Sequence, residues 1–330
     1  GSVSTPFLFC IFSVMINEVR ETVLAIANKE NFGYITPTDF NRYAVKAQLD
    51  IFTQLMYDYN HQVNKQNKRT TILGASVASN DDFADLAKRK LKLIEEFSTS
   101  TPLYVASSSI SGSHILSQPS DSYFLNTLMH YGAATLTGTA SGASTSFNLQ
   151  DTSGSTTFTS AMEGAPIVNT TTRAFGYITN VIDGNNVNVS TDLMFASGNG
   201  YQVFPTSSTE IEHQEKSKIH KLLVSNLTAP STIFPVYTVS DYGVTVYPNT
   251  LPNTGIIIAN YIRYPKDPKW TYIGNNFNQS AADFQDFELP ESELPVLVHK
   301  ILEYAGIEIR EPAVTQYALG QTTLETKEDR

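Results

Sequence analysis

Residues 255–270 read GIIIANYIRYPKDPKW, an apolar run that continues into a proline-rich segment of aromatic and cationic side chains. The run GIIIANYI, residues 255–262, predicts a strand. The two prolines that follow fix φ and stiffen the chain, so the segment Tyr261–Trp270 should hold its side chains in a set arrangement. It contains the only tryptophan of the chain and three cations, although the net charge is -10.

Trp, Tyr and Arg are the residues that dominate binding hot spots, so this segment is a candidate contact with another protein chain. The alternative is that Trp270 closes the core of its own subunit while the cations are solvated. The candidate interface residues are Tyr261, Arg263, Tyr264, Lys266, Lys269 and Trp270.

Helices are expected at both ends of the chain. Apolar residues at helical spacing predict a first helix that ends near Lys29 and a second that runs to about Lys65. Thr36 is the expected N-cap of the second helix, with Pro37 at its first position and Asp39 as the capping-box acid. A third helix should start after residues 80–81. Near the C-terminus, Ser292 should cap a last helix that ends at Gly306.

The middle of the chain is rich in β-structure. Short apolar runs separated by Gly and Asn turns predict a small closed barrel or sandwich over residues 131–205, inserted into the rest. Within it, Asp183-Gly184-Asn185 predicts a hairpin. Paired strands are expected again at PVYTV, VTVYP and GIIIANYI. The expected fold class is therefore α+β, with terminal helices that bracket antiparallel β-structure.

The expected divisions of the chain follow from this pattern. Residues 15–130 should hold the N-terminal helices and first strands, and residues 206–310 the later strands and the last helix. Residues 1–14 are either an expression remnant before an authentic Met15 or an arm that docks onto a neighbouring subunit. The polar tail 311–330 should become ordered only in an assembly, because it cannot bury enough apolar surface alone.

Composition and motifs exclude several classes of function. A net charge of -10 argues against a nucleic-acid binder as a whole, because phosphate contacts need clustered Lys and Arg. The single cysteine, Cys10, excludes a disulfide framework and a multi-cysteine metal site. The six histidines show no HExxH spacing, and neither GxSxG nor a phosphate-binding glycine loop occurs. We therefore expect no enzyme, no catalytic residue, no cofactor and no metal.

Four stretches resemble a known family of virion proteins. They are GYITPTDFNRYAVKAQLDIF, QPSDSYFLNTL, SNLTAPSTIFPVYTVSDYGVTVYP leading into YIRYPKDPKW, and ELPVLVHKILEYAGIEIREP. The chain resembles the head-to-tail adaptor proteins that form a ring beneath the portal in short-tailed bacteriophages, above all those of crAss-like phages. The resemblance covers most of residues 15–319.

The resemblance implies a structural protein of the virion, made in the cytoplasm of the bacterial host. It implies a homo-oligomer, usually a ring of twelve subunits, that links the portal to further tail or ring proteins and lines the channel for the genomic DNA without sequence-specific binding. No membrane is involved. An acidic channel would repel phosphates, although acidity also serves solubility. Tyr317 and Leu319 would anchor the C-terminal tail on a neighbouring subunit.

Two other functions stay open at this point. A receptor- or glycan-binding tail protein is favoured by the Ser-, Thr- and Asn-rich barrel with Tyr177 and Tyr201. It predicts trimers and a long β-rich shaft. A wall hydrolase would need a carboxylate or metal constellation that the sequence does not contain.

Overall fold

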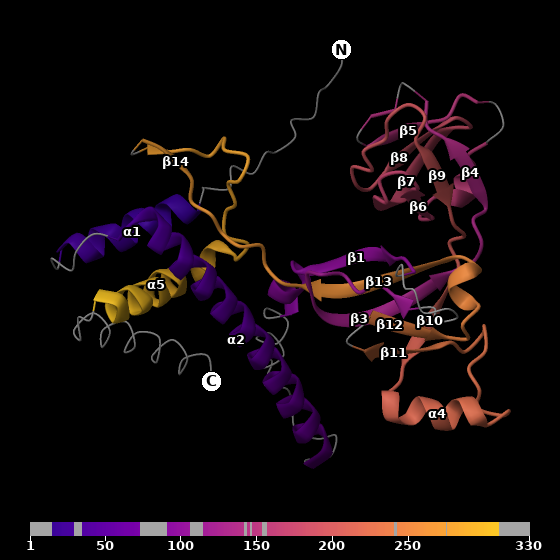
Figure 1. Cartoon of the computed structure of the whole chain (residues 1–330), viewed down its shortest axis with the longest axis horizontal. Coiled ribbons are helices and arrows are strands. Elements are labelled where there is room, and N and C mark those ends of the chain that lie inside the picture. Colours follow the sequence, from indigo (N-terminus) through magenta and orange to yellow (C-terminus); the bar gives the residue numbers. More distant parts are fainter. Residues whose placement is uncertain are drawn as a thin grey trace. The chain divides into compact units, whose positions relative to one another are not determined.

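The computed structural model describes residues 15–29, 35–72, 91–105, 115–141, 144–145, 147–153, 157–240, 243–274 and 276–309. The chain is a mixed α+β protein with mostly sheet and a few helices (Figure 1). It divides into two compact units. The helical unit combines residues 1–97 with residues 264–330, and the sheet unit comprises residues 98–263. The predicted arm at residues 1–14 and the tail at 311–330 lie outside the described residues.

In the described part of the helical unit, α5 (Leu294–Ile309) packs against α1 (Met15–Lys29) and α2 (Pro37–Ile72). Figure 1 shows α5 beside α1 and α2, and it contacts both. Each helix buries apolar residues at spacings of three and four, which places them on one face. These residues are Ile16, Val19, Val23 and Ala27 of α1, Phe40, Ala44, Ala47 and Ile51 of α2, and Leu297, Val298, Ile301 and Ala305 of α5.

The starts of α1 and α2 are capped in different ways. Thr36 caps α2 as predicted, since the Asp39 N–H donates to Thr36 Oγ1 at 3.2 Å. The cap of α1 comes from far along the chain: Asp286 accepts from the N–H groups of Met15 and Ile16, at 3.0 and 2.8 Å. A carboxylate there satisfies free N–H groups and complements the positive end of the helix dipole. The segment that follows Trp270 is thus tied to α1.

Two predicted helix ends are wrong. α2 continues to Ile72 rather than ending near Lys65. Gly306 does not stop the last helix, which continues to Ile309. Ser292 is not its cap, because the residue lies inside a 3-10 turn, η4 (Glu291–Glu293), that leads directly into α5. A glycine is tolerated inside a helix when packing holds the turns on either side of it.

The sheet unit contains a seven-stranded sheet in the order β1-β13-β3-β10-β11-β12-β2. Only β10 and β11 pair in parallel, and the other neighbours are antiparallel. The run Ile256–Arg263 forms β13 between β1 and β3, so the opening sequence supplies an inner strand. The strands are β1 (Ser98–Leu103), β2 (Ile115–Leu116), β3 (Ser122–Tyr131), β10 (Ser208–His213), β11 (Val236–Ser240), β12 (Gly243–Tyr247) and β13.

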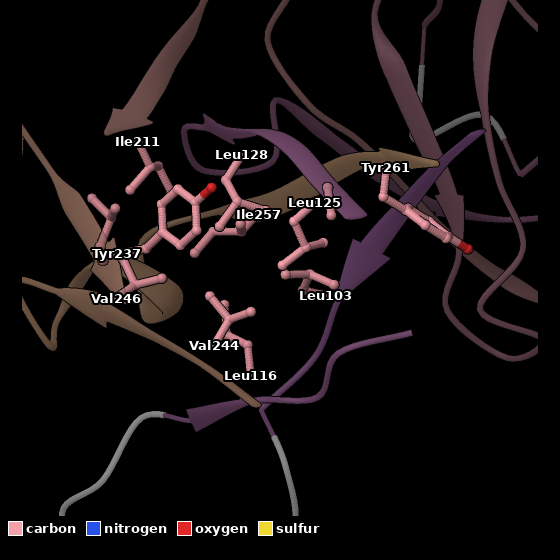
Figure 2. Close-up of a cluster of buried hydrophobic side chains, with 12 residues drawn as sticks. Leu103, Leu116, Leu125, Leu128, Ile211, Tyr237, Val244, Val246, Ile257 and Tyr261 are labelled. Atoms are coloured by element: carbon pink, nitrogen blue, oxygen red, sulfur yellow. The ribbon is translucent and has the colours of Figure 1, made fainter. Parts of the chain in front are cut away.

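One face of this sheet carries the core shown in Figure 2. Leu128, Val244 and Ile257 are almost fully buried there and come from three different strands. Alternate residues of a strand point to the same face, which is why β-branched and leucine residues at period two form this cluster.

A second, six-stranded antiparallel sheet has the order β4-β9-β6-β7-β8-β5 and curls around its own core. Its chain leaves the first sheet after Tyr131 and returns at Ser208, and these two residues are paired partners of β3 and β10. The predicted hairpin at Asp183-Gly184-Asn185 is confirmed, since it joins β7 to β8. The strands are β4 (Leu136–Thr139), β5 (Asn148–Gln150), β6 (Pro166–Asn169), β7 (Phe175–Asp183), β8 (Asn186–Val189) and β9 (Gly200–Val203).

Candidate protein interface

Trp270 lies in the interior of the helical unit, where only 3% of its surface is exposed. Its indole Nε1–H donates to Asn17 Oδ1 of α1 at 3.0 Å. Asn41 of α2 accepts from the Trp270 backbone N–H at 2.9 Å and donates to the Trp270 carbonyl at 3.1 Å. The Arg20 guanidinium lies 3.9 Å from the centre of the ring, which adds a cation–π interaction. The ring therefore joins α1 and α2 to the loop that follows β13.

The two lysines that precede Trp270 in the sequence, Lys266 and Lys269, remain at the surface. Lys269 Nζ contacts Asp283 Oδ2 at 2.5 Å, and this hydrogen bond is the main reason that the pKa of Asp283 is lowered. Both side chains are more than half exposed, so the pair adds little stability. Lys266 is exposed, while its backbone is held by the amide of buried Gln48, whose Nε2 donates to the Lys266 carbonyl at 2.7 Å.

The other predicted interface residues lie apart from Trp270. Tyr261 and Arg263 belong to the sheet unit, whereas Tyr264 begins the second part of the helical unit. Tyr261 is buried and its hydroxyl donates to Asp121 Oδ1 at 3.0 Å. Burial and this hydrogen bond raise the pKa of Tyr261 to about 12. Tyr264 is partly exposed, with its ring 6.0 Å from that of Phe52. Tyr317 and Leu319 lie outside the described residues.

A short hairpin next to Trp270 presents apolar side chains to solvent. It consists of β14 (Tyr272–Ile273) and β15 (Asn276–Phe277), which Figure 1 shows as an extension beyond α1. Tyr272 stacks on Trp270 with 5.4 Å between the ring centres, yet half of its surface is exposed. Ile273 is 71% exposed. The interface hypothesis for this region therefore rests on exposed Tyr264, Lys266, Tyr272 and Ile273, since Trp270 is covered by its own chain.

Beside this hairpin lies a pocket of about 560 Å³ between the first turns of α2 and the loop 267–283. Asn41 and Trp270 form part of its wall, and Arg42 and Asp283 bring one charge of each sign. A pocket of this size, with mixed charge at the rim, suits a side chain of a partner protein.

A larger apolar surface lies in the sheet unit, in the segment that connects β10 to β11. This segment contains α4 (Lys216–Val224), labelled in Figure 1, and the turns that follow it. The buried residue of α4 is Ile219. Five large apolar residues of residues 223–234 are exposed, among them Leu227 at 94% and Phe234 at 77%. We call this set the α4 patch: Leu223, Val224, Leu227, Ile233 and Phe234.

Local hydrogen bonds order the segment that carries the α4 patch, and exposed lysines lie on the same helix. Ala229 N–H donates to the Ser225 carbonyl at 2.9 Å, and Phe234 N–H donates to Ser231 Oγ at 3.2 Å. Lys216, Lys218 and Lys221 of α4 are exposed, and Lys218 forms an exposed ion pair with Glu215. Exposed apolar side chains flanked by polar and charged residues are typical of protein-binding surfaces.

Sequence reasoning missed the α4 patch. The apolar residues of 222–234 fit neither the helical nor the alternating pattern once Pro230 is passed. That failure to match either period was the available signal, because apolar residues without a core-facing period lack an obvious place in their own core.

Within the described part of the chain, no three His, Cys, Asp or Glu side chains gather as a metal site would require. None of the helices described there has the length and apolar character needed to cross a bilayer. A comparison with models of known protein families finds none that matches this chain, and a comparison with curated proteins finds no match either.

Proposed function

We propose that this chain is a structural virion protein of a short-tailed, crAss-like bacteriophage and forms an oligomeric ring in the head-to-tail connector. In this proposal it links the portal to the tail and lines the channel through which the DNA leaves. The ring has about twelve copies, and the protein catalyses no reaction. The proposal rests on the sequence resemblance together with the surface properties of the two units.

The α4 patch is the observation that carries the proposal. Folded monomers rarely leave so many large apolar side chains exposed over one short segment, unless a partner covers them. Full burial of one such side chain is worth about 1.5–3 kcal/mol, so five of them supply a large favourable term. Part of this term is offset by the entropy lost on association.

We assign a second copy of this chain as the partner of the α4 patch. The rim of the patch is basic, whereas the chain as a whole carries a net charge of -10. A neighbouring copy therefore presents an acidic surface on average, which complements Lys216, Lys218 and Lys221. In a ring each subunit uses two different surfaces, so the α4 patch of one copy contacts another face of the next copy.

The two units take different roles in this proposal. The helices α1, α2 and α5 form the adaptor body that packs against the portal, with the β14–β15 hairpin as its exposed contact. The six-stranded sheet is the inserted small barrel, directed toward the tail or the exterior. An acidic channel wall keeps the DNA phosphates from adhering during ejection.

The oligomeric state tests this function. The full chain is measured by mass photometry and negative-stain microscopy, alone and with the portal protein of the same virion as a template. Rings of about twelve copies are expected. Trimers that bind glycans would instead identify a receptor-binding tail protein, and a chain that cleaves cell-wall polymer would identify an enzyme.

A pair of matched variants tests the α4 patch itself. Leu227→Ser with Phe234→Ser should abolish rings while leaving the melting temperature unchanged, because both side chains are exposed. Ile182→Ser with Phe147→Ser is the control. These two residues are also more than half exposed, but they lie in the part of the chain that forms the six-stranded sheet. Rings that survive the first pair of substitutions would contradict the assignment.

A further inference from the structure

The sheet unit contains a second cavity, of about 350 Å³, between the edge of the seven-stranded sheet and the start of the loop after β6. Most of the residues that line it are apolar, although polar and apolar atoms contribute nearly equal areas to its wall; three of the apolar ones, Leu103, Leu116 and Ile257, are labelled in Figure 2. Its polar lining comes from Tyr104, Thr170, Arg173 and Gln202. The volume lies at the lower end of the range for small-molecule sites, about 300–1,000 Å³.

Tyr104 brings an unused hydrogen-bonding group to this cavity. Its hydroxyl is buried and has no hydrogen-bond partner among the described residues. The backbone at this position is fixed, because Ser117 N–H donates to the Tyr104 carbonyl at 2.9 Å. A tyrosine hydroxyl is protonated at neutral pH, and burial raises the pKa of Tyr104 further, so this hydroxyl is available as a donor. A buried polar group without a partner is unusual enough in proteins to call for an explanation.

Arg173 brings a positive charge to the same place. Its guanidinium lies 4.7 Å from the centre of the Tyr104 ring, and within the described residues no carboxylate forms an ion pair with it. Stacking on the ring uses the face of the guanidinium and leaves the N–H groups on its edge free to bind an anion. Arg173 is exposed and also lines the cavity, so it brings a positive charge to the cavity from the surface of the sheet unit.

The backbone holds Arg173 in position at an energetic cost. Its φ is +63°, a left-handed conformation that residues other than Gly, Asn and Asp rarely adopt. The turn before it is organised by fully buried Asn169, whose Oδ1 accepts from the N–H groups of Thr171 and Thr172 at 2.9 and 3.1 Å. Asn169 Nδ2 also donates to the Leu193 carbonyl at 3.0 Å. Backbone strain of this kind is concentrated at ligand sites.

We propose that this cavity binds a small organic monocarboxylate with a short apolar body. The planar fork of Arg173 matches the two oxygens of a carboxylate, and the Tyr104 hydroxyl supplies a further donor. Val168, Phe204 and Ile257 would cover the apolar part of the ligand. At about 30 Å³ for a water-sized group, the cavity accommodates roughly ten non-hydrogen atoms. A phosphate is a poorer fit, because a dianion needs more than one cation and gains nothing from apolar walls.

The test uses the full chain and hexanoate as the probe, followed by NMR of the backbone amides of Thr170 and Gln202 and of the Arg173 Nε–H. Hexanoate should shift these signals and saturate, while hexanol and acetate should bind at least about tenfold more weakly, because each lacks one half of the recognition. Arg173→Asn keeps a residue that tolerates the left-handed conformation but removes the cation. It should weaken hexanoate binding at least about tenfold.

Two controls separate binding from folding. Met194 is the other described non-glycine residue with positive φ, so Met194→Asn makes the same backbone change away from the cavity and should leave the affinity unchanged. Tyr104→Phe keeps the ring under Arg173 and removes only the hydroxyl, so it should weaken hexanoate binding several-fold with native melting. Equal binding of hexanoate to the wild type and to both cavity variants, or no saturable shift in the wild type, would overturn the proposal.

Discussion

Replacing Trp270 should unfold the helical unit far more readily than any change at its exposed neighbours. The side chain of Trp270 is only 3% exposed, its indole donates one hydrogen bond to Asn17, and its ring lies against Arg20. Truncation of a buried Trp to Ala costs about 3–5 kcal/mol. Trp270→Phe keeps most of the packing but loses the hydrogen bond of the indole N–H, which costs about 1 kcal/mol of stability. It also loses part of the cation–π interaction with Arg20.

Urea unfolding measures this difference. Because α1, α2 and α5 belong to the helical unit, far-UV circular dichroism reports mainly on that unit, and the fluorescence of the sole Trp reports on it in the wild type. With a urea dependence of about 1–3 kcal/mol per molar, Trp270→Ala should lower the midpoint by at least about 1 M. Lys269→Ala is the matched control at the adjacent residue and should leave it unchanged, since its ion pair is exposed. A Trp270→Ala subunit with an unchanged midpoint that no longer assembles would refute the reasoning and support a direct interface role.

Three further changes test other parts of the structure. Replacing residues 132–204 by a short Gly/Ser linker should leave a protein that still unfolds cooperatively, because Tyr131 and Ser208 are paired neighbours, although Ile256 and Ile258 lose the cover of Val168 and Phe204; loss of the cooperative transition in circular dichroism would show a shared core. Gly255→Ala should lower the stability of the sheet unit, measured by urea unfolding, by about 1–3 kcal/mol, because a Cβ at this position would clash with the carbonyl oxygen of Tyr131. Gly132→Ala is the control and should be tolerated, since its Cβ would make only an ordinary contact with Pro205. The pKa of Tyr261 is raised from 10.0 to about 12, so its contribution to stability is complete below pH 10 and is lost as the pH rises toward 12; the urea midpoint should therefore fall less steeply over this range in Tyr261→Phe than in the wild type.

Local features of the structure could be predicted from the sequence because they depend on neighbouring residues. The cap at Thr36, the turn at Gly184 and Asn185, and the strand 256–263 each follow from a few consecutive side chains. The predicted helix end at Gly306 was wrong for a physical reason. A glycine ends a helix only where the backbone turns away from the helix axis, and the buried face Leu297–Ala305 favours continuation of α5. The carboxylate of Asp286 at the start of α1 could not be predicted, since the two residues are about 270 positions apart in the chain.

The role of Trp270 illustrates where residue type stops being informative. A lone tryptophan among prolines and cations fits an interface hot spot and a core residue equally well, because both sites exclude water and offer a hydrogen-bond acceptor to the indole N–H. The contacts of Trp270 with Asn17 and Asn41 show that its own chain covers it, and these residues lie on two helices that are far from Trp270 in the sequence. The reverse applies to Leu227 and Phe234, which are residue types usually found in a core but are exposed.

Because Trp270 is buried and the α4 patch is exposed, we propose a different surface for assembly from the one predicted from the sequence. Residues 264–270 would still serve the proposed ring, because burial of Trp270 and the hydrogen bond from Gln48 to Lys266 hold the β14–β15 hairpin and Lys266 against α1 and α2 within the helical unit. Such pre-ordering lowers the entropy lost when Tyr272 and Ile273 meet a partner. The α4 patch supplies what that segment lacks, namely a set of exposed apolar side chains with cations at their edge. Subunits that each carry a net charge of -10 repel one another, which opposes assembly. Exposed lysines beside apolar side chains would replace this repulsion by local attraction to an acidic neighbour.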